Sequence, residues 1–375
     1  MDSQQSMFVV LGAFYLFESL LWLPKDSLAL VAGVTGRFRL IRPESLLKNE
    51  HGAAVWKALL PPGRSTFLTT AMPVAVSPEG VAKTDSGDEA LTWEDIETLS
   101  PKGRWIRING RKWWKTPSYH NSVQLAGRLN AIRKAPSTDR EKAIGNWMTE
   151  RFRSKDAASA LDDIRKPLRT LRVLANILFV CLFVALLPLS FVYSYQNLWG
   201  WIFGGMLLQT IPIAVLFRRL HARLYPEADD ERFTAWLTMA LFAPAAIRAH
   251  DLVTLPLLYR FHPMVAAAAV MKESDARQYA GKQLRALHFR SGGDRIETEE
   301  SLSQRILSWQ RARTLARVEK FCESSGWKVE NLLRAPERTD PEAKSYCPRC
   351  FAEFILEDGV CSDCGGVSLR RFEET

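Results

Sequence analysis

The sequence SYCPRCFAEFILEDGVCSDCGGVSLRRF, residues 345–372, contains two Cys-x-x-Cys pairs separated by ten residues. The pairs are Cys347 with Cys350 and Cys361 with Cys364. A Cys-x-x-Cys turn brings two sulfurs close enough to share one metal ion, and four thiolates suit the tetrahedral coordination of Zn²⁺. The spacing therefore predicts a metal-binding module over residues 341–375 with these four cysteines as ligands.

This segment resembles a zinc ribbon. Gly365 and Gly366 let the backbone turn tightly after the second pair, and Phe351 and Phe354 can cover one face of a module too small for its own core. The resemblance implies a structural Zn²⁺ ion, because four protein ligands leave no coordination position for a substrate. A rubredoxin-like iron site and a redox-active dithiol pair are the alternatives.

The other cysteines and the charge place limits on the rest of the chain. Cys181 and Cys322 are single, which argues against a secreted disulfide scaffold and favours a cytosolic location for the C-terminal end. The net charge is +9, which fits either nucleic-acid binding or basic cytosolic segments beside membrane spans.

Upstream of the cysteines, residues 272–340 are charged and favour helices. Four apolar residues recur at intervals that allow one face to be buried: Ile306, Trp309, Leu315 and Val318. Four basic residues on the same segment could contact nucleic acid or lipid, although such runs more often form a solvated face: Arg311, Arg313, Arg317 and Lys320.

Long apolar runs predict membrane spans. VLANILFVCLFVALLPLSFVYSY, residues 173–195, carries no charge and is long enough to cross a bilayer. With residues 198–217 it predicts a transmembrane hairpin over 173–217. Residues 7–23 predict an uncleaved membrane anchor within residues 1–35, because no cleavage site closes the run.

Lysine and arginine residues flank both feet of the predicted hairpin, whereas its turn has none. The positive-inside rule then predicts a multi-pass inner-membrane protein of bacterial type, with its N-terminus outside and its C-terminus in the cytosol. This charge distribution favours membrane lipid over nucleic acid as the partner of the basic residues.

A fourth apolar region, residues 235–271 within the segment 218–271, is interrupted by prolines and charged residues. We expect two short helices that re-enter the membrane or lie at its interface. The predicted fold class is thus an α-helical integral membrane protein with three spans and a broken fourth region, a cytosolic mixed α/β domain and a C-terminal zinc ribbon.

Residues 36–134 alternate short β-type runs with polar segments and end in a helical pattern. Asn109–Gly110 between two such runs predicts a β-hairpin. SPEGVAKTDSGDEALTWEDIETL, residues 77–99, resembles bacterial pleckstrin-homology-like domains over roughly residues 37–134. The resemblance implies a small β-barrel capped by a helix and used for docking. Residues 135–172 predict a basic helical linker.

Five ionisable residues in or near the apolar runs are candidate functional groups, since charges at membrane depth usually have a role. They are Glu18, Arg248, His250, Asp251 and His262. The spacing that places two histidines on one helix face as zinc ligands is absent, because position 254 is Thr. We expect an interfacial ion pair between Arg248 and Asp251.

These observations favour a non-enzymatic function. We expect a membrane-anchored scaffold or adaptor that presents its cytosolic domains and a structural zinc ribbon to a protein partner. One alternative is a membrane enzyme or transporter subunit that uses the five ionisable residues. A weaker alternative is a protein that tethers nucleic acid through its C-terminal tail.

Overall fold

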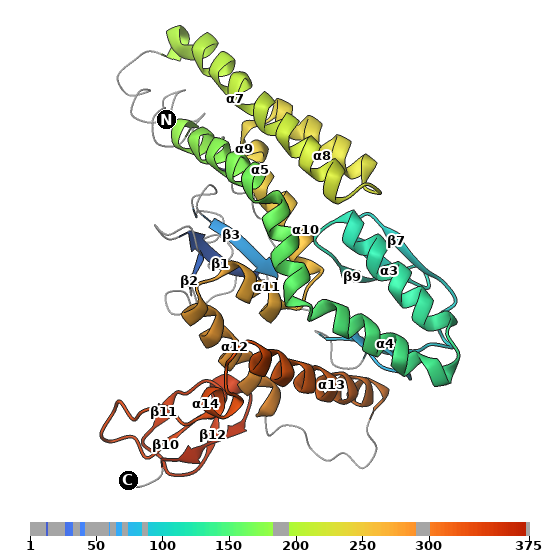
Figure 1. The fold of residues 1–375 in the computed structure, drawn as a ribbon, viewed down its shortest axis with the longest axis vertical. Helices are drawn as coiled ribbons and strands as arrows, with labels where there is room; N and C mark the ends of the chain where they lie inside the picture. The colour runs from blue at the N-terminus through green and yellow to red at the C-terminus, as the bar shows by residue number, and fades with distance from the viewer. Residues whose placement is uncertain are drawn as a thin grey trace. The chain divides into compact units, whose positions relative to one another are not determined.

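The computed structural model describes Ala13 and residues 27–32, 38–41, 60, 65–69, 74–84, 89–182, 195–289 and 301–372. The chain divides into two compact units, each assembled from separate stretches of sequence (Figure 1). Unit 1 comprises Met1–Ala71, Thr98–Leu129 and Arg153–Met271, and unit 2 comprises Met72–Glu97, Asn130–Phe152 and Lys272–Thr375.

Unit 1 contains two antiparallel sheets and a group of helices. The first sheet has the order β2-β1-β3, and the second has the order β7-β8-β9. The strands are β1 (Ser27–Ala32), β2 (Phe38–Ile41), β3 (Ser65–Thr69), β7 (Leu99–Lys102), β8 (Trp105–Ile108) and β9 (Arg111–Lys115). The helices are α3 (Tyr119–Lys134, of which the start lies in this unit), α5 (Ser154–Val180), α7 (Tyr195–Leu224), α8 (Asp229–Leu241), α9 (Ala243–Ile247), α10 (Ala249–Tyr259) and α11 (Pro263–Val270).

The predicted hairpin at Asn109–Gly110 is confirmed. β8 and β9 pair antiparallel on either side of it, and both turn residues have positive φ, 49° and 78°. Asn and Gly tolerate this left-handed conformation better than other residues, which is why they start such turns. The predicted helix after the hairpin is also present as α3, with Leu125 and Leu129 buried.

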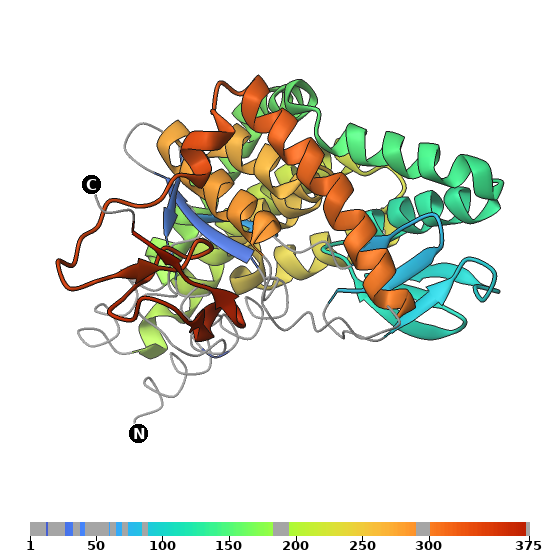
Figure 2. The ribbon, with the colours of Figure 1, turned by 90° about the horizontal axis from the view of Figure 1, so that it is seen from below.

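Unit 2 contains a three-stranded antiparallel sheet, four helices and the cysteine-rich module. The sheet has the order β4-β5-β6, and Figure 2 shows α13 lying across it. The sheet and helices are β4 (Val74–Val76), β5 (Gly80–Lys83), β6 (Ala90–Thr92), α4 (Ser137–Arg151), α12 (Glu273–His288), α13 (Leu302–Ser324) and α14 (Val329–Leu333). The module contains β10 (Ser345–Tyr346), β11 (Glu353–Phe354), β12 (Val360–Cys361), the 3₁₀ turn η3 (Ser362–Cys364), β13 (Val367–Ser368) and β14 (Arg370–Arg371).

The β4-β5-β6 sheet depends on a close approach at Gly80. A Cβ atom at this position would lie 2.0 Å from the carbonyl oxygen of Leu91 on the neighbouring strand. The Trp93 indole then donates a hydrogen bond of 3.0 Å to the carbonyl of Ser77 and covers the same turn. Ile306 of α13 packs against Ala75 and Ala82, so the predicted buried face of this helix closes the sheet.

The predicted membrane fold is wrong for the residues that the structure describes. Within them, no helix is both long enough and apolar enough to cross a membrane. α5 carries charged residues along most of its length before its apolar end, and Gln209 and Thr210 interrupt the apolar sequence of α7. The multi-pass topology and the inner-membrane location based on it are corrected accordingly. Of the predicted anchor, residues 7–23, only Ala13 lies among the described residues, and residues 183–194 of the predicted hairpin lie outside them.

Much of the apolar sequence instead forms the core of unit 1. The core cluster includes Leu171 and Leu178 of α5, Phe217 of α7, and Val253 and Leu257 of α10. The broken apolar region, residues 235–271, belongs to α8, α9, α10 and α11, and most side chains of α10 and α11 are buried against protein. Its apolar residues reflect burial in a protein core, which composition alone does not distinguish from burial in lipid.

Candidate metal centre

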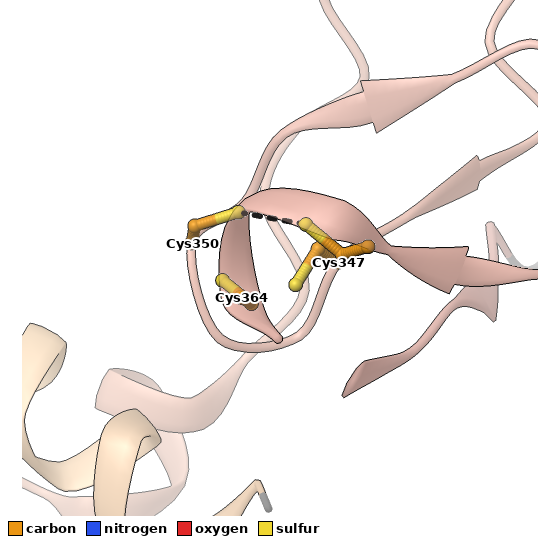
Figure 3. A group of neighbouring side chains, drawn as sticks. Cys347, Cys350 and Cys364 are labelled. Carbon is orange, nitrogen blue, oxygen red and sulfur yellow. Dashed lines mark hydrogen bonds between the residues drawn. The ribbon is translucent and has the colours of Figure 1, made fainter. Parts of the chain in front are cut away.

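The four cysteines of the C-terminal module lie together. Their sulfurs are all within 4.8 Å of one another, and the Sγ atoms of Cys350 and Cys361 are 3.8 Å apart. Figure 3 shows the side chains of Cys347, Cys350 and Cys364 converging from two loops. Two of the thiols are buried and two are partly or fully exposed, so the site lies at the surface of the module. The four residues predicted as one ligand set thus lie within metal-binding distance of one another.

Positive φ angles at both Cys-x-x-Cys turns bring the sulfurs together. Phe351 has φ 66° after the first pair, and Gly365 and Gly366 have φ 70° and 87° after the second. The amide of Phe351 donates to the carbonyl of Cys347 at 2.8 Å, and the amide of Gly366 donates to the carbonyl of Cys361 at 2.9 Å. Glycine adopts this conformation without strain, whereas Phe351 does so at a cost that its own contacts must offset.

The thiols differ in how readily they ionise. Burial disfavours the Cys347 thiolate, but backbone N–H groups of Cys350 and Arg349 stabilise it, and the net effect lowers the pKa of Cys347. Burial raises the pKa of Cys350 and of Cys364. A bound cation would stabilise all four thiolates and reverse these increases, because metal ligation requires the deprotonated form.

The distances fit a tetrahedral metal ion. Four sulfurs at ~2.3 Å from a central ion would lie ~3.8 Å from one another. Cys350 and Cys361 match this separation. The same distance is far longer than the ~2.05 Å bond of a disulfide. The cluster can therefore hold a metal ion, and its four thiolates would leave no open position for a substrate.

Helix α12 supports the module from one side. Phe289, which follows α12, packs into the cluster formed by Cys347, Cys361 and Val367. The guanidinium of Arg370 lies 4.7 Å from the centre of the Phe289 ring. The metal ligands thus pack directly against a residue of the helical part of unit 2.

A second cation–π contact explains the unusual conformation of Phe351. The Arg285 guanidinium of α12 lies 3.8 Å from the centre of the Phe351 ring, and Arg285 also donates hydrogen bonds to the carbonyls of Leu332 and Arg349. The sequence suggested that Phe351 covers the metal site. In the structure its ring contacts α12 instead, and Phe354 packs on the cysteines.

Three of the candidate ionisable residues form a buried cluster within unit 1. Arg248 and Asp251 of unit 1 are each 1% exposed, with Nη1 and Oδ2 3.3 Å apart, and His250 Nε2 lies 3.2 Å from the other carboxylate oxygen. Burial raises the pKa of Asp251 to about 7, and Arg248 and Arg172 oppose this increase. The predicted Arg248–Asp251 pair is present, but it lies inside the protein core.

His262 lies outside this cluster of ion pairs. His262 precedes α11, where its Nδ1 accepts a hydrogen bond of 3.3 Å from the amide of Met264. This contact is typical of a helix N-cap. Glu18 lies outside the described residues.

A histidine cluster in unit 1 was missed by the sequence interpretation. Nδ1 of His120 lies 2.8 Å from the Glu227 carboxylate. The rings of His120 and His221 both pack against the Tyr225 ring, with distances between ring centres of 4.8 and 4.9 Å. Burial lowers the pKa of His221 to about 4, helped by Arg232 and His120. His221 also lines a small pocket of about 20 Å³, large enough for one water molecule. The four-residue spacing of His221, on α7, and Tyr225, directly after it, was the one local signal for this cluster.

The arginine-rich helix α13 uses its cations within the protein. Arg311 donates to the carbonyls of Ala286 and Leu287, Arg313 pairs with Glu141, and Arg317 donates to the carbonyl of Gly145. These contacts join α13 to α12 and α4 and give three of the four basic residues an intramolecular partner.

No protein-family model matches the chain, and no curated protein or solved structure shows significant similarity to it. The cysteine cluster is compatible with a zinc ribbon. The resemblance of residues 37–134 to pleckstrin-homology-like domains stays a prediction.

Proposed function

We propose that the protein is a scaffold or adaptor whose four-cysteine module holds a structural zinc ion and binds a protein partner. The observation that carries this proposal is the combination of a closed four-thiolate site with an exposed apolar loop in the same small module. Four cysteine ligands favour a structural ion, and zinc is the metal most often found in such sites. Iron in a rubredoxin-like site is the competing identity.

The loop after β11 and the first residue of β12 supply the binding surface. Ile355, Leu356 and Val360 are 63%, 66% and 61% exposed, and we call these three residues the ribbon tip. Single exposed apolar residues are common, but three within six positions form a patch of the kind found at protein interfaces. Exposing these three apolar side chains to water does not stabilise the module, because apolar surface stabilises a fold only when it is removed from water.

Ion pairs hold the tip in place. Lys344 and Arg371 both contact the Glu357 carboxylate, at 3.0 and 3.4 Å, and Arg371 also pairs with Asp358. These groups are exposed, so each pair contributes little stability. Their effect is to restrict the loop that carries the apolar residues, which lowers the entropic cost of binding.

The buried cluster of Arg248, His250 and Asp251 supports a structural role for these residues over the enzyme or transporter alternative. They contact one another in the core, and the small pocket described above is lined by His221 and Glu231 instead. The internal partners of Arg311, Arg313 and Arg317 likewise make nucleic-acid tethering the weaker proposal.

Metal analysis and partner capture test the proposal together. The full chain, purified without added metal, should contain about one zinc per chain, and Cys361→Ser with Cys364→Ser should lose it. In cells, Ile355→Ser with Leu356→Ser should abolish cross-linking to a defined partner while leaving the zinc content unchanged. Glu330→Ser, which changes an exposed residue of α14 outside the tip, is the control and should retain both. A protein that contains iron, or tip variants that retain the cross-link, would contradict the proposal.

A further inference from the structure

Helix α7 carries an exposed apolar stripe. Leu207, Leu208, Ile211 and Val215 are 46%, 76%, 53% and 41% exposed. Their spacing of one, three and four residues places them on one side of the helix. The opposite side of α7 contains Ile213 and Phe217, which are buried in the core of unit 1. The helix is therefore apolar on both its inner and its outer side along this stretch.

The helices beside α7 carry similar stripes. Helix α5 exposes Val173, Ile177 and Val180 at 50%, 46% and 42%, and helix α8 exposes Phe233, Leu237 and Leu241 at 56%, 40% and 73%. Each set follows a spacing of three or four residues, so each occupies one helix face. Figure 1 shows α5, α7 and α8 running beside one another, in agreement with their contacts.

Two hydrogen bonds show that the stripes lie at the same level. Gln209 of α7 donates to the sulfur of Cys181 just after α5, at 3.6 Å. Thr210 of α7 donates to the carbonyl of Ala240 on α8, at 3.2 Å. The ends of α5 and α8 that carry Val180 and Leu241 thus lie at the level of Leu207 and Leu208 on α7. We call the ten residues of the three stripes the apolar face.

Exposed basic residues border the apolar face on two helices. On α7, Arg218, Arg219 and Arg223 begin three residues beyond Val215, less than one helical turn away. On α5, Arg165, Lys166 and Arg169 precede Val173 by about one turn or more. The guanidinium of Arg218 lies 5.2 Å from the centre of the Trp236 ring of α8, so the basic border reaches the third helix.

Acidic residues offset part of this charge. Asp162 pairs with Arg165, and Asp229 pairs with Arg232. Asp230 is also exposed at the start of α8. Asp163 and Glu227 are exposed as well. With Asp162 and Asp229 already paired, the remaining five basic residues of the border, on α5 and α7 together, outnumber Asp163, Glu227 and Asp230, so the border remains basic.

We propose that the apolar face with its basic border binds an anionic lipid surface, lying in the headgroup layer without crossing it. Apolar side chains of a helix lying at the interface insert among lipids, and neighbouring arginines contact their phosphates. This proposal goes beyond the adaptor function and uses residues of unit 1 only. It requires no spanning helix.

Charge distinguishes lipid from a second copy of the chain as the occupant. A second copy would bring the same basic border and no surplus of acidic groups to pair with it. An anionic headgroup layer supplies the missing negative charge over the whole border. An anionic lipid surface is therefore the occupant that can cover the apolar face and also pair with its basic border.

Vesicle flotation of the purified full chain tests this inference. The chain should float with vesicles containing 30% phosphatidylglycerol in phosphatidylcholine, and binding should weaken with salt and with pure phosphatidylcholine. Replacing Arg218, Arg219 and Arg223 together with Ala should weaken binding about 100-fold at low salt, since each basic residue contributes about fivefold. Leu208→Asn with Leu241→Asn should abolish binding at every lipid composition.

The same flotation assay provides the control and the results that would contradict the inference. Ile355→Ser with Leu356→Ser, in the ribbon tip of unit 2, should float as wild type does. Wild-type chain that stays with the soluble fraction at low salt would overturn the inference without any variant. So would flotation that the Leu208 and Leu241 changes leave intact, or a stable dimer in light scattering that these changes dissociate. Failure here leaves the zinc and partner experiments unaffected, because they concern other residues.

Discussion

The contact between Phe289 and the metal ligands predicts that the metal ion and helix α12 stabilise each other. Phe289 packs against Cys347, Cys361 and Val367, and its ring also contacts the Arg370 guanidinium. A small module of this kind folds with its metal, so this packing is available only when the metal is bound. Substituting Phe289 should therefore weaken metal binding, although Phe289 is no ligand.

The magnitude follows from the burial of Phe289. Removing a fully buried phenylalanine side chain costs about 3–5 kcal/mol. Phe289 is partly exposed, so about half of this applies, and the cation–π contact adds about 0.5 kcal/mol. Phe289→Ala should thus reduce the coupling free energy between metal binding and the packing of α12 by about 2 kcal/mol. This corresponds to about 30-fold weaker metal affinity.

The assay is competition with a chromophoric zinc chelator on the full chain. Phe289→Leu keeps most of the apolar contact but loses the ring, and we expect about threefold weaker binding from the cation–π term and a small loss of volume. Phe233→Ala, at an exposed position of α8, should bind zinc as wild type does.

Urea unfolding followed by circular dichroism provides the reciprocal measurement. Phe289→Ala should lower the free energy of unfolding by about 2 kcal/mol with metal present and by much less after chelation. An affinity change below threefold, or an equal loss of stability with and without metal, would refute the coupling.

Three further predictions concern the core and the backbone. Asp251→Ala should destabilise unit 1 by about 3–5 kcal/mol in thermal or urea unfolding, because it leaves Arg248 buried without its carboxylate. Gly365→Ala should cost about 1 kcal/mol of metal-bound stability at φ 70°, seen as several-fold weaker zinc binding in the chelator assay. The pKa of His221 lies at about 4 in the folded state, below its ordinary value of 6.5, so the unfolded chain takes up more protons between these values. His221 should therefore lower stability as the pH falls from 6.5 to 4, by up to about 3 kcal/mol, and the lowered pKa of His120 acts in the same direction. The raised pKa of Asp251 acts in the opposite direction over this range, so the contribution of His221 is measured as the difference between wild type and His221→Gln in pH-resolved unfolding.

Features fixed within a few residues could be predicted from the sequence. The Cys-x-x-Cys pairs set their own sulfur positions through turns of four residues, and Asn109–Gly110 selected its hairpin by tolerating positive φ. The helical pattern at the end of residues 36–134 likewise predicted α3. In each case the determining interactions lie within the segment that carries the pattern.

Features that depend on distant residues could not be predicted. His120 and Glu227 are more than a hundred positions apart and meet only after unit 1 has folded. Arg248 and Asp251 were expected to pair at a membrane interface, but their burial depends on α5, which contributes Arg172, and on Phe67 of β3. The division of the chain into two interleaved units has the same origin.

The error about membrane spans has a specific physical cause. Sequence hydropathy measures how much apolar surface leaves water and does not say what replaces the water. In α10 the replacement is protein, since residues such as Val253 and Leu257 are fully buried. In α7 the inner side meets protein, whereas the outer side, with Leu208 at 76% exposure, meets no described part of the chain. Both helices look alike in composition and differ only in what surrounds them.

The ribbon tip and the apolar face can be separated by experiment because they differ in charge as well as in place. The acidic groups beside the tip, Glu357 and Asp358, are paired with Lys344 and Arg371, so binding there should depend weakly on salt. The basic residues of α5 and α7 that border the apolar face outnumber their exposed acidic neighbours, so binding there should weaken more strongly as salt increases. A salt titration of partner capture and of vesicle flotation on the same preparation should therefore give two different slopes. Equal slopes would mean that one surface accounts for both activities, and the assignment of protein to the tip and lipid to the face would then be wrong.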